Sequence, residues 1–236
     1  MKQLLGFRYI VLVIFLFSGI QQAAAQRFIL NMPEHDQKPY YFGITFGLNF
    51  SQYRIRYTDA FAQTDTFKRI QSDFSPGFNL GLMANLRLNK RIDVRTIPSL
   101  SFAEKKLMYT FPFTDSAVNK SIESIYLHLP LQLKFKSDRI HNFRFYGMLG
   151  GKIDYDLAAN ARSRRNDEFL KVKPLDAGYE IGVGFEFYNA NFIFSPEIKL
   201  SQGLMNQIYK DQNLQLTNSI EQINTRMIVI SIHLEG

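Results

Sequence analysis

Apolar and polar side chains alternate along residues 74–88 (FSPGFNLGLMANLRL). Phe, Leu, Ala and Pro occupy the even positions, and mostly Ser, Gly and Asn occupy the odd ones. A period of two predicts an extended strand with one apolar and one polar face. The segment is about twice as long as an ordinary strand of a soluble protein, and it exceeds the ~9–11 residues with which a tilted strand crosses a bilayer. We interpret it as one strand of a transmembrane β-barrel.

Seven further segments show the same alternation. They cover residues 40–54, 92–102, 124–135, 143–157, 175–187, 192–201 and 228–234. Short turns (89–91, 137–142, 188–191) alternate along the chain with long polar segments (55–73, 110–121, 158–173, 205–222). An even number of strands, joined by short turns at one end and long loops at the other, is typical of bacterial outer-membrane barrels. The sequence therefore predicts an all-β fold, an eight-stranded antiparallel transmembrane barrel over residues 40–236, whose last strand pairs with its first.

The N-terminus has the pattern of a secretory signal peptide. Basic residues precede a short apolar core at 9–17, and three alanines at 23–25 form a small-residue cleavage site. We expect residues 1–25 to be removed and residues 26–39 to form a short periplasmic segment. The alternative is an anchoring helix, but the apolar core is short for a membrane span. The predicted location is the outer membrane, with both termini in the periplasm.

Charge and cysteine content restrict the partners and the chemistry. The chain contains no Cys, so neither a lipidated N-terminus nor a disulfide is possible. Its formal net charge is +7, and removing Lys2 and Arg8 with the signal peptide leaves +5. A basic chain can indicate nucleic-acid binding. Here the basic residues are spread over strands and loops of an exported protein, so no nucleic-acid partner is expected.

The polar face of each strand is predicted to line the interior. An eight-stranded barrel has just enough internal space for side chains, and the Gly, Ser and Asn of the polar face fit that space better than Leu, Ile and Phe. Buried charges must be paired, so we predict a filled interior with an ion-pair network and no open pore. Its predicted members are Arg87, Asp93, Arg95, Lys134, Arg144, Lys152, Asp154, Glu180, Glu186, Glu197 and Lys199, and Asp176 falls on the same inward face.

Aromatic residues at strand ends are predicted to form two interfacial girdles. One girdle comprises Tyr41, Phe42, Phe143, Phe185, Phe187, Tyr188 and Phe192, and the other comprises Tyr53, Phe74, Phe102, Tyr109 and Tyr155. Four prolines also fall inside predicted strands: Pro76, Pro98, Pro130 and Pro196. Proline cannot donate to a sheet ladder, so we expect bulges or strand ends at these positions.

Candidate catalytic and metal chemistry is sparse. His128 and His233 fall on inward positions, where each could be a catalytic base, but no oriented triad follows from the spacing and a polar core role is the simpler interpretation. No His pair at i, i+4 and no Cys suggests a metal site. No cofactor is expected, and the chain is predicted not to be an enzyme. In the loop 158–173, Arg162, Arg164 and Arg165 could bind lipopolysaccharide or a protein partner, or could simply be solvated.

Several runs are similar to a known family. They are GFNLGLMANLRLNKRIDVRTIPSLSF at 77–102, IYLHLPLQLKFK at 125–136, FYGMLGGKIDYDLAANA at 145–161 and DAGYEIGVGFEFYNANFIFSPEIKLSQGLMN at 176–206. Together they resemble the PorT (SprT) family of outer-membrane β-barrels of the type IX secretion system in Bacteroidota. The resemblance covers nearly all of the mature chain. One departure from barrels in general is the C-terminus, which ends in Leu-Glu-Gly and not in an aromatic residue.

The resemblance implies a role in protein export by that system, and in gliding motility where it is present. It implies no catalytic residues, and it implies partners among the other secretion proteins besides the lipid and lipopolysaccharide of the outer membrane. The alternatives are a small transport or adhesin-like barrel of the general OmpX/OmpA type, and a barrel enzyme acting on lipid or peptide.

Overall fold

A computed structural model describes residues 29–58, 69–110, 117–159, 172–209 and 220–236, and residues 31–236 form one unit. A short 3-10 helix, Pro33–Gln37, precedes the sheet. The strands are β1 (Tyr40–Tyr57), β2 (Arg69–Asp73), β3 (Ser75–Arg87), β4 (Ile92–Thr96), β5 (Ser99–Thr110), β6 (Ala117–Lys136), β7 (Phe143–Asp156), β8 (Leu175–Tyr188), β9 (Ile193–Gly203) and β10 (Ile220–Glu235). No helix within the described ranges could span a bilayer.

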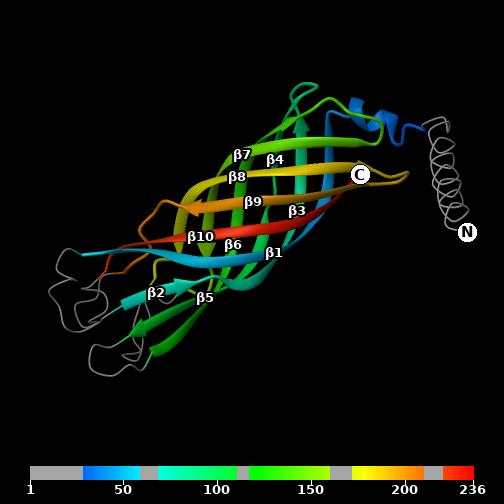
Figure 1. Cartoon of the computed structure of the whole chain (residues 1–236). Coiled ribbons are helices and arrows are strands. Elements are labelled where there is room, and N and C mark those ends of the chain that lie inside the picture. Colours follow the sequence, from blue (N-terminus) through cyan, green and yellow to red (C-terminus); the bar gives the residue numbers. More distant parts are fainter. Residues whose placement is uncertain (1–28, 59–68, 111–116, 160–171, 210–219) are drawn as a thin grey trace, which may run out of the picture. The chain divides into compact units, whose positions relative to one another are not determined.

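These segments form eight barrel strands in one closed antiparallel sheet (Figure 1). β2 and β3 are successive parts of one barrel strand, and β4 and β5 are successive parts of another. β1 pairs with β10 on one side and with β3 on the other, which closes the sheet and leaves no free edge along the barrel wall. The predicted eight-stranded antiparallel barrel is confirmed.

The register of the strands fixes the geometry of the barrel. Paired residues lead once around the wall through Tyr41, Asn85, Arg95, Gln132, Gly150, Glu180, Ser201, Met227 and Ser51. The path begins at residue 41 of β1 and returns at residue 51 of the same strand, which is a shear of ten residues. Strands of such a barrel tilt by about 35–45° from its axis, and the interior has room for side chains only.

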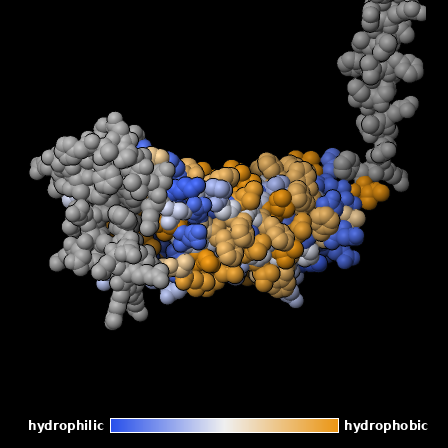
Figure 2. Space-filling view, turned by 90° about the horizontal axis from the view of Figure 1, so that it is seen from below, coloured by the Kyte–Doolittle hydropathy of each residue, from blue (hydrophilic) through white to orange (hydrophobic). Residues whose placement is uncertain are grey.

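The apolar face of the strands points outward. Leu82 and Leu131 are 68% and 65% exposed, whereas Asn79 and Asn85 between the outward leucines of β3 are buried. The face seen in Figure 2 carries an apolar belt that is bounded by hydrophilic side chains toward both ends. A soluble barrel would have the opposite arrangement, so this wall is built for the hydrocarbon core of a membrane.

Each of the four strand prolines lies where pairing with one neighbouring strand is interrupted. Pro98 lies in the break between β4 and β5, and Pro130 of β6 faces the same break. Pro196 lies in a gap of the β8–β9 ladder, and Pro76 lies beyond the end of the β3–β5 ladder. Pairing continues on the other side of Pro76, Pro130 and Pro196. The missing N–H groups are therefore accommodated at local gaps and strand ends.

The sheet extends further than predicted at the end of the barrel that carries the long loops. β2 lies within a predicted loop, β10 begins at Ile220 and so eight residues before the predicted strand 228–234, and β5 and β6 pair as far as Thr110 and Ala117. A bulge precedes β3, because residues 74–77 lie opposite residues 103–105. The extra residue reverses the inward face, so that Ile70 of β2 points into the barrel.

This end of the barrel is filled by an apolar cluster that the alternating pattern did not predict. We call it the loop-side cluster. Its buried members are Tyr53, Ile70, Leu107, Val172, Ile208, Ile220 and Ile223. The polar interior expected along the whole barrel is thus replaced here by a small hydrophobic core, which stabilises the strands that extend past the apolar belt.

The girdle prediction is wrong for Tyr41, Tyr53 and Tyr188, and it is right for Tyr155 and for most of the described phenylalanines. Tyr41, Tyr53 and Tyr188 are buried inside the barrel, whereas Phe42 and Phe185 are outward and exposed. A tyrosine hydroxyl needs a hydrogen-bond partner when it is buried, and the charged interior supplies one. The side chain of Tyr109 lies outside the described residues.

Candidate functional site

The interior of the barrel is the candidate site, and it contains all eleven residues predicted for the ion-pair network. Ten of them are buried and Arg87 is partly buried. They come from β3, β4, β6, β7, β8 and β9, and strand alternation places each on the inward face. The groups are arranged in successive layers along the barrel.

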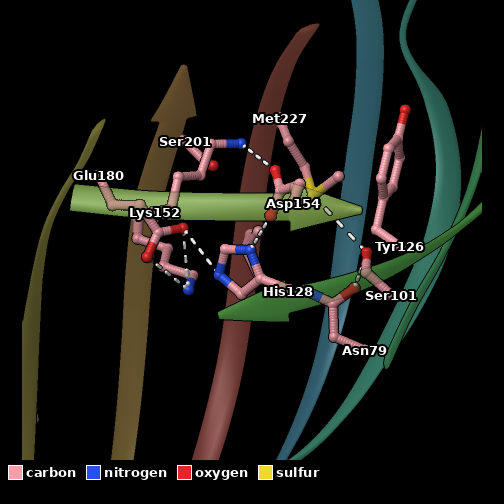
Figure 3. A pocket seen from close by; sticks show the side chains of 11 residues that line it. Asn79, Ser101, Tyr126, His128, Lys152, Asp154, Glu180, Ser201 and Met227 are labelled. Carbon is pink, nitrogen blue, oxygen red and sulfur yellow. Dashed lines mark hydrogen bonds and ion pairs between the residues drawn. The ribbon is translucent and has the colours of Figure 1, made fainter. Parts of the chain in front are cut away.

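His128 is the centre of one layer (Figure 3). Its Nδ1 lies 2.5 Å from Asp154 Oδ1, and its Nε2 lies 3.3 Å from Glu180 Oε1. Lys152 Nζ lies 2.6 Å from Asp154 Oδ2, and Lys199 Nζ lies 3.2 Å from Glu180 Oε1. Each carboxylate is thus shared by a histidine and a lysine, and both ring nitrogens of His128 are engaged. The cavity among these groups has a volume of about 10 Å³, which is about enough for one water molecule.

Arg95 and Glu197 form the next layer. Arg95 Nη2 lies 2.6 Å from Glu197 Oε2, and both side chains are completely buried. Arg95 Nε donates to Gln132 Oε1 at 2.8 Å, while Gln132 Nε2 donates to Glu180 Oε2 at 2.7 Å. Gln132 therefore joins this layer to the layer of His128 by using both ends of its amide.

Lys134 and Glu186 form a third layer nearer the short turns. Lys134 Nζ lies 2.5 Å from Glu186 Oε1 and 3.6 Å from Glu235 Oε1. Arg144 Nη1 lies 3.5 Å from the other oxygen of Glu186, to which the Tyr188 hydroxyl donates at 2.8 Å. Removing Lys134 would leave two carboxylates facing each other in a buried space.

Asp93 anchors the last group of strand residues before the opening of the barrel. The Tyr41 hydroxyl donates to Asp93 Oδ2 at 2.9 Å, and Lys136 Nζ lies 2.7 Å from Asp93 Oδ1. Arg87 Nε lies 4.0 Å from the same oxygen. Arg87 also reaches beyond the strands, because its Nη1 donates to the backbone oxygen of His35 at 2.9 Å.

Residues 31–38, which we call the N-terminal strap, are fastened to the end of the barrel that carries the short turns. Asp36 lies 3.2 Å from Arg139 Nη1 and 2.9 Å from Arg144 Nη2. Arg139 also donates to the backbone oxygen of Asn31. The sequence indicated only an irregular segment here. The structure adds a helical turn whose carboxylate neutralises two arginines at the opening.

The buried ring of His35 holds the middle of the strap. It packs edge-on against the ring of Tyr41 at 4.5 Å, and neither ring nitrogen has a hydrogen-bond partner among the described residues. Burial, followed by the nearby charge of Arg87, lowers the pKa of His35 from 6.5 to about 4. Burial acts to raise the pKa of Asp36, but Arg144 and Arg139 outweigh it and hold that pKa below its ordinary value.

Sequence reasoning missed four charged residues of the interior: Lys105, Lys136, Asp156 and Glu235. All four are buried. Each lies an even number of positions from a residue already assigned to the inward face, such as Lys134 for Lys136 and His233 for Glu235. The signal was the same alternation: the predicted strands ended too early to include Lys105, Lys136 and Glu235, while Asp156 was overlooked within the predicted strand 143–157.

The buried charges balance. With the partly buried Arg87, the described interior holds eight cations and eight carboxylates. The cations are Arg87, Arg95, Lys105, Lys134, Lys136, Arg144, Lys152 and Lys199, and the carboxylates are Asp93, Asp154, Asp156, Asp176, Glu180, Glu186, Glu197 and Glu235. An interior of opposite charges at hydrogen-bond distance is a packed core that ties distant strands together.

The two inward histidines serve in this core. His233 Nδ1 lies 2.8 Å from Thr45 Oγ1, and its Nε2 lies 3.6 Å from Glu197 Oε2. Among the described residues no group of three or more His, Asp or Glu side chains could hold a metal ion. The predicted loop contacts Arg162, Arg164 and Arg165 lie outside the described residues.

Known proteins with similar architecture are outer-membrane barrels. A family model described as outer membrane protein beta-barrel domain matches residues 24–209. The outer membrane protein OprG of Pseudomonas aeruginosa has 14% sequence identity and a TM-score of 0.50, with 84% of this chain and 95% of OprG covered. Neisserial surface protein A has 8% sequence identity and a TM-score of 0.43, with 82% of this chain and 96% of that protein covered. Ail of Yersinia pestis has 12% sequence identity and a TM-score of 0.39, with 84% of this chain and 100% of Ail covered.

At these identities the similarity to OprG concerns the fold alone. No curated protein sequence matches the chain significantly. The family match, in contrast, covers most of the chain, and it agrees with the closed sheet and the apolar outer wall. The protein therefore belongs to the outer membrane β-barrel domain family and is an integral protein of the outer membrane.

Proposed function

We propose that the protein is a non-enzymatic, non-conducting barrel that serves as a structural or accessory component of a protein-export apparatus, the type IX secretion system. The observation that carries the proposal is the interior, where eight cations and eight carboxylates fill the space between the strands. A lumen packed in this way is suited neither to passing solutes nor to admitting a substrate. The function then lies in the outer wall and the two ends, which are surfaces for partners.

The assignment to this export system is supported by the sequence resemblance to the PorT (SprT) family of Bacteroidota. In this proposal both termini and the short turns lie in the periplasm, and the long loops lie outside the cell. The partners are other secretion proteins, together with the lipid and lipopolysaccharide around the barrel. Where the organism glides, the same barrel supports gliding motility.

A second candidate is a small transport or adhesin-like barrel of the OmpX/OmpA type. The family match and the fold of OprG support this candidate more directly than they support the export role, because they concern outer-membrane barrels in general. In an adhesin-like barrel the work is done by the loops, and in a transport barrel a path through the interior must open.

A deletion strain tests the export role. We expect loss of secretion of proteins with C-terminal sorting domains, and recovery when the gene is restored on a plasmid. A strain that secretes these proteins normally, while losing surface adhesion or solute uptake, would favour the second candidate. Mild crosslinking and co-purification from the wild-type strain then identify the partners, and we expect secretion proteins among them.

A further inference from the structure

Three arginines gather on the outer wall, just beyond the apolar belt. Arg54 and Arg56 belong to β1, and Arg226 belongs to the adjacent strand β10. Arg54 and Arg56 are exposed and Arg226 is half-buried. Arg226 pairs with Gln52, so Arg54 lies diagonally across from it on the same face. Diagonal side chains of neighbouring strands are within reach of one another when they are long.

The outward side chains of β1 and β10 change from apolar to basic between one residue pair of the ladder and the next outward pair. Phe50 pairs with Ile228, and the next outward pair is Gln52 with Arg226. Leu48 and Ile230, one pair deeper in the belt, are 59% and 50% exposed. A lipid has the same order, with acyl chains below and a charged headgroup above. Figure 2 shows hydrophilic side chains beside the belt toward this end.

Within the described part of the chain, no carboxylate forms an ion pair with these three guanidinium groups. Arg226 is held by Gln202, whose Oε1 accepts a hydrogen bond from Arg226 Nε at 3.0 Å. Gln202 also donates to the backbone oxygens of Gly203 and Thr225, so it is itself held in place. Arg226 is thus oriented through Nε while its two terminal nitrogens remain available. No described carboxylate forms an ion pair with Arg54 or Arg56.

The outward charges on β5, which lies second from β1 in the sheet, differ. Lys106 of β5 lies 3.8 Å from Glu104 of the same strand, so basic and acidic groups alternate there. Like charges on neighbouring strands repel each other, and Arg54, Arg56 and Arg226 therefore favour a bound anion. Guanidinium groups bind phosphate through paired N–H donors.

We propose that Arg54, Arg56 and Arg226 form a binding site for the phosphate headgroup of an outer-leaflet lipid, whose acyl chains lie on Phe50, Ile228 and Ile230. The ligand class is a phosphorylated lipid such as lipid A. This assignment rests on the orientation given under the proposed function, in which the loop-bearing end faces the outer leaflet. It differs from the loop arginines considered in the sequence, because it is built on two paired strands of the wall.

Lipid binding to the purified mature barrel tests this site. The probes are lipid A, the same lipid A without its phosphates, and inorganic phosphate, with bound lipid counted by native mass spectrometry and affinity measured by titration in detergent. We expect lipid A to bind at least about tenfold more tightly than its dephosphorylated form, because charge-assisted bonds are lost. We expect millimolar inorganic phosphate not to displace it, since the apolar belt also contributes to binding.

The variant Arg54→Gln/Arg56→Gln/Arg226→Gln should lose at least about tenfold in affinity for lipid A. Arg91→Gln is the matched control, because Arg91 is an exposed arginine in a short turn at the other end, where it pairs with Asp138. It should bind as wild type does. Heat-modifiable migration on gels shows whether each variant is folded. If the triple variant fails to fold, the single variant Arg226→Gln replaces it, and we expect it to weaken lipid A binding about threefold or more.

Equal binding of the two lipid A forms, equal loss in Arg91→Gln, or full competition by inorganic phosphate would overturn the proposal. The assay uses the purified barrel alone, so a failed export role leaves its outcome unchanged. The orientation has its own readout, which is labelling of Arg56→Cys in whole cells with a membrane-impermeant maleimide. Labelling is expected, and its absence would remove the outer leaflet as the source of the lipid.

Discussion

Arg95 of β4 and Glu197 of β9 meet at the centre of the barrel, with 2.6 Å between Nη2 and Oε2 and no exposure of either side chain. β4 and β9 are not neighbours in the sheet. The pair therefore connects opposite walls through the interior, and Tyr146 of β7 joins it by donating to the same Glu197 oxygen at 2.8 Å. Hydrogen bonds of the ladder join only neighbouring strands, so such pairs add a second set of connections.

Breaking this pair should destabilise the barrel strongly. Glu197→Ala leaves Arg95 buried without its partner, which costs about 3–5 kcal/mol. Arg95→Met/Glu197→Met removes both charges and should cost less than Glu197→Ala. Urea unfolding in detergent or lipid vesicles measures both. A double variant that is as unstable as Glu197→Ala would show that packing matters here and pairing does not.

Leu82→Arg tests which face meets lipid. Leu82 is 68% exposed in the middle of β3, so an arginine there should cost about 2–4 kcal/mol of folding free energy in a bilayer. Leu88, which is 56% exposed just after the end of the same strand, is the matched control. Leu88→Arg should cost only about 0–1 kcal/mol near the interface. Equal effects at the two positions would contradict the placement of the belt.

Glycine-to-alanine substitutions test how tightly the interior is packed where neighbouring strands approach closely. A Cβ added to Gly182, which faces the interior, would lie 2.7 Å from the Ile198 oxygen and 2.8 Å from Lys199 Cβ. Gly182→Ala should therefore cost about 1–3 kcal/mol through overpacking. Gly147 on the facing strand has its nearest such atom 3.9 Å away, so Gly147→Ala should be neutral or stabilising by up to about 1 kcal/mol. Unfolding curves of both variants decide whether the interior is as tightly packed as described.

The N-terminal strap should detach in acid. Because the pKa of His35 is about 4 in the docked strap and 6.5 when it is free, the docked form resists protonation between these values. The docked strap has its full stability above pH 6.5. Its free energy of docking weakens by up to about 3 kcal/mol as the pH falls to 4. The charges around His35 are those of Arg87, Lys38, Asp36 and Glu186.

Hydrogen exchange of residues 31–38 at pH 7 and pH 4.5 measures this loss. Protection should fall in wild type, while His35→Phe, which keeps a ring but cannot be protonated, should remain protected over the same interval. The stability contributed by the Asp36 ion pairs is lost only as the pH falls from the ordinary carboxyl pKa of 3.8 through the lowered pKa of Asp36, which lies below the pH 4.5 of this measurement. Unchanged protection of wild type at pH 4.5 would contradict the account of the strap.

Alternation and the spacing of turns and loops predicted the closed barrel, side-chain size assigned its outward face, and the two together predicted the eleven charged residues of the interior. Alternation contributes because a period of two assigns every residue of a strand to one face once the strand is recognised. It could not locate the bulge before β3, since an extra residue reverses the faces without leaving a signal in composition. The burial of Ile70 follows from that change of register, whereas Leu107 continues the inward face of β5 beyond the predicted strand.

The sequence also could not predict which cation pairs with which carboxylate in the interior. Arg95 could face any carboxylate of the lumen, and the shear of the barrel decides that it meets Glu197. The tyrosines illustrate a different difficulty. A tyrosine suits either an interfacial girdle or a polar core. Tyr41 and Tyr188 lie in the core because their hydroxyl groups donate hydrogen bonds to Asp93 and Glu186 there.

Conductance through the purified barrel tests the filled interior most directly. The mature protein is inserted into planar bilayers and recorded at neutral pH over a range of voltages, with a barrel of known open pore as the positive control. The packed layers of His128, Arg95 and Lys134 predict no stable channel, and Glu197→Ala, which loosens one layer, should show at most brief openings. A steady channel of defined size in the wild-type protein would contradict the account.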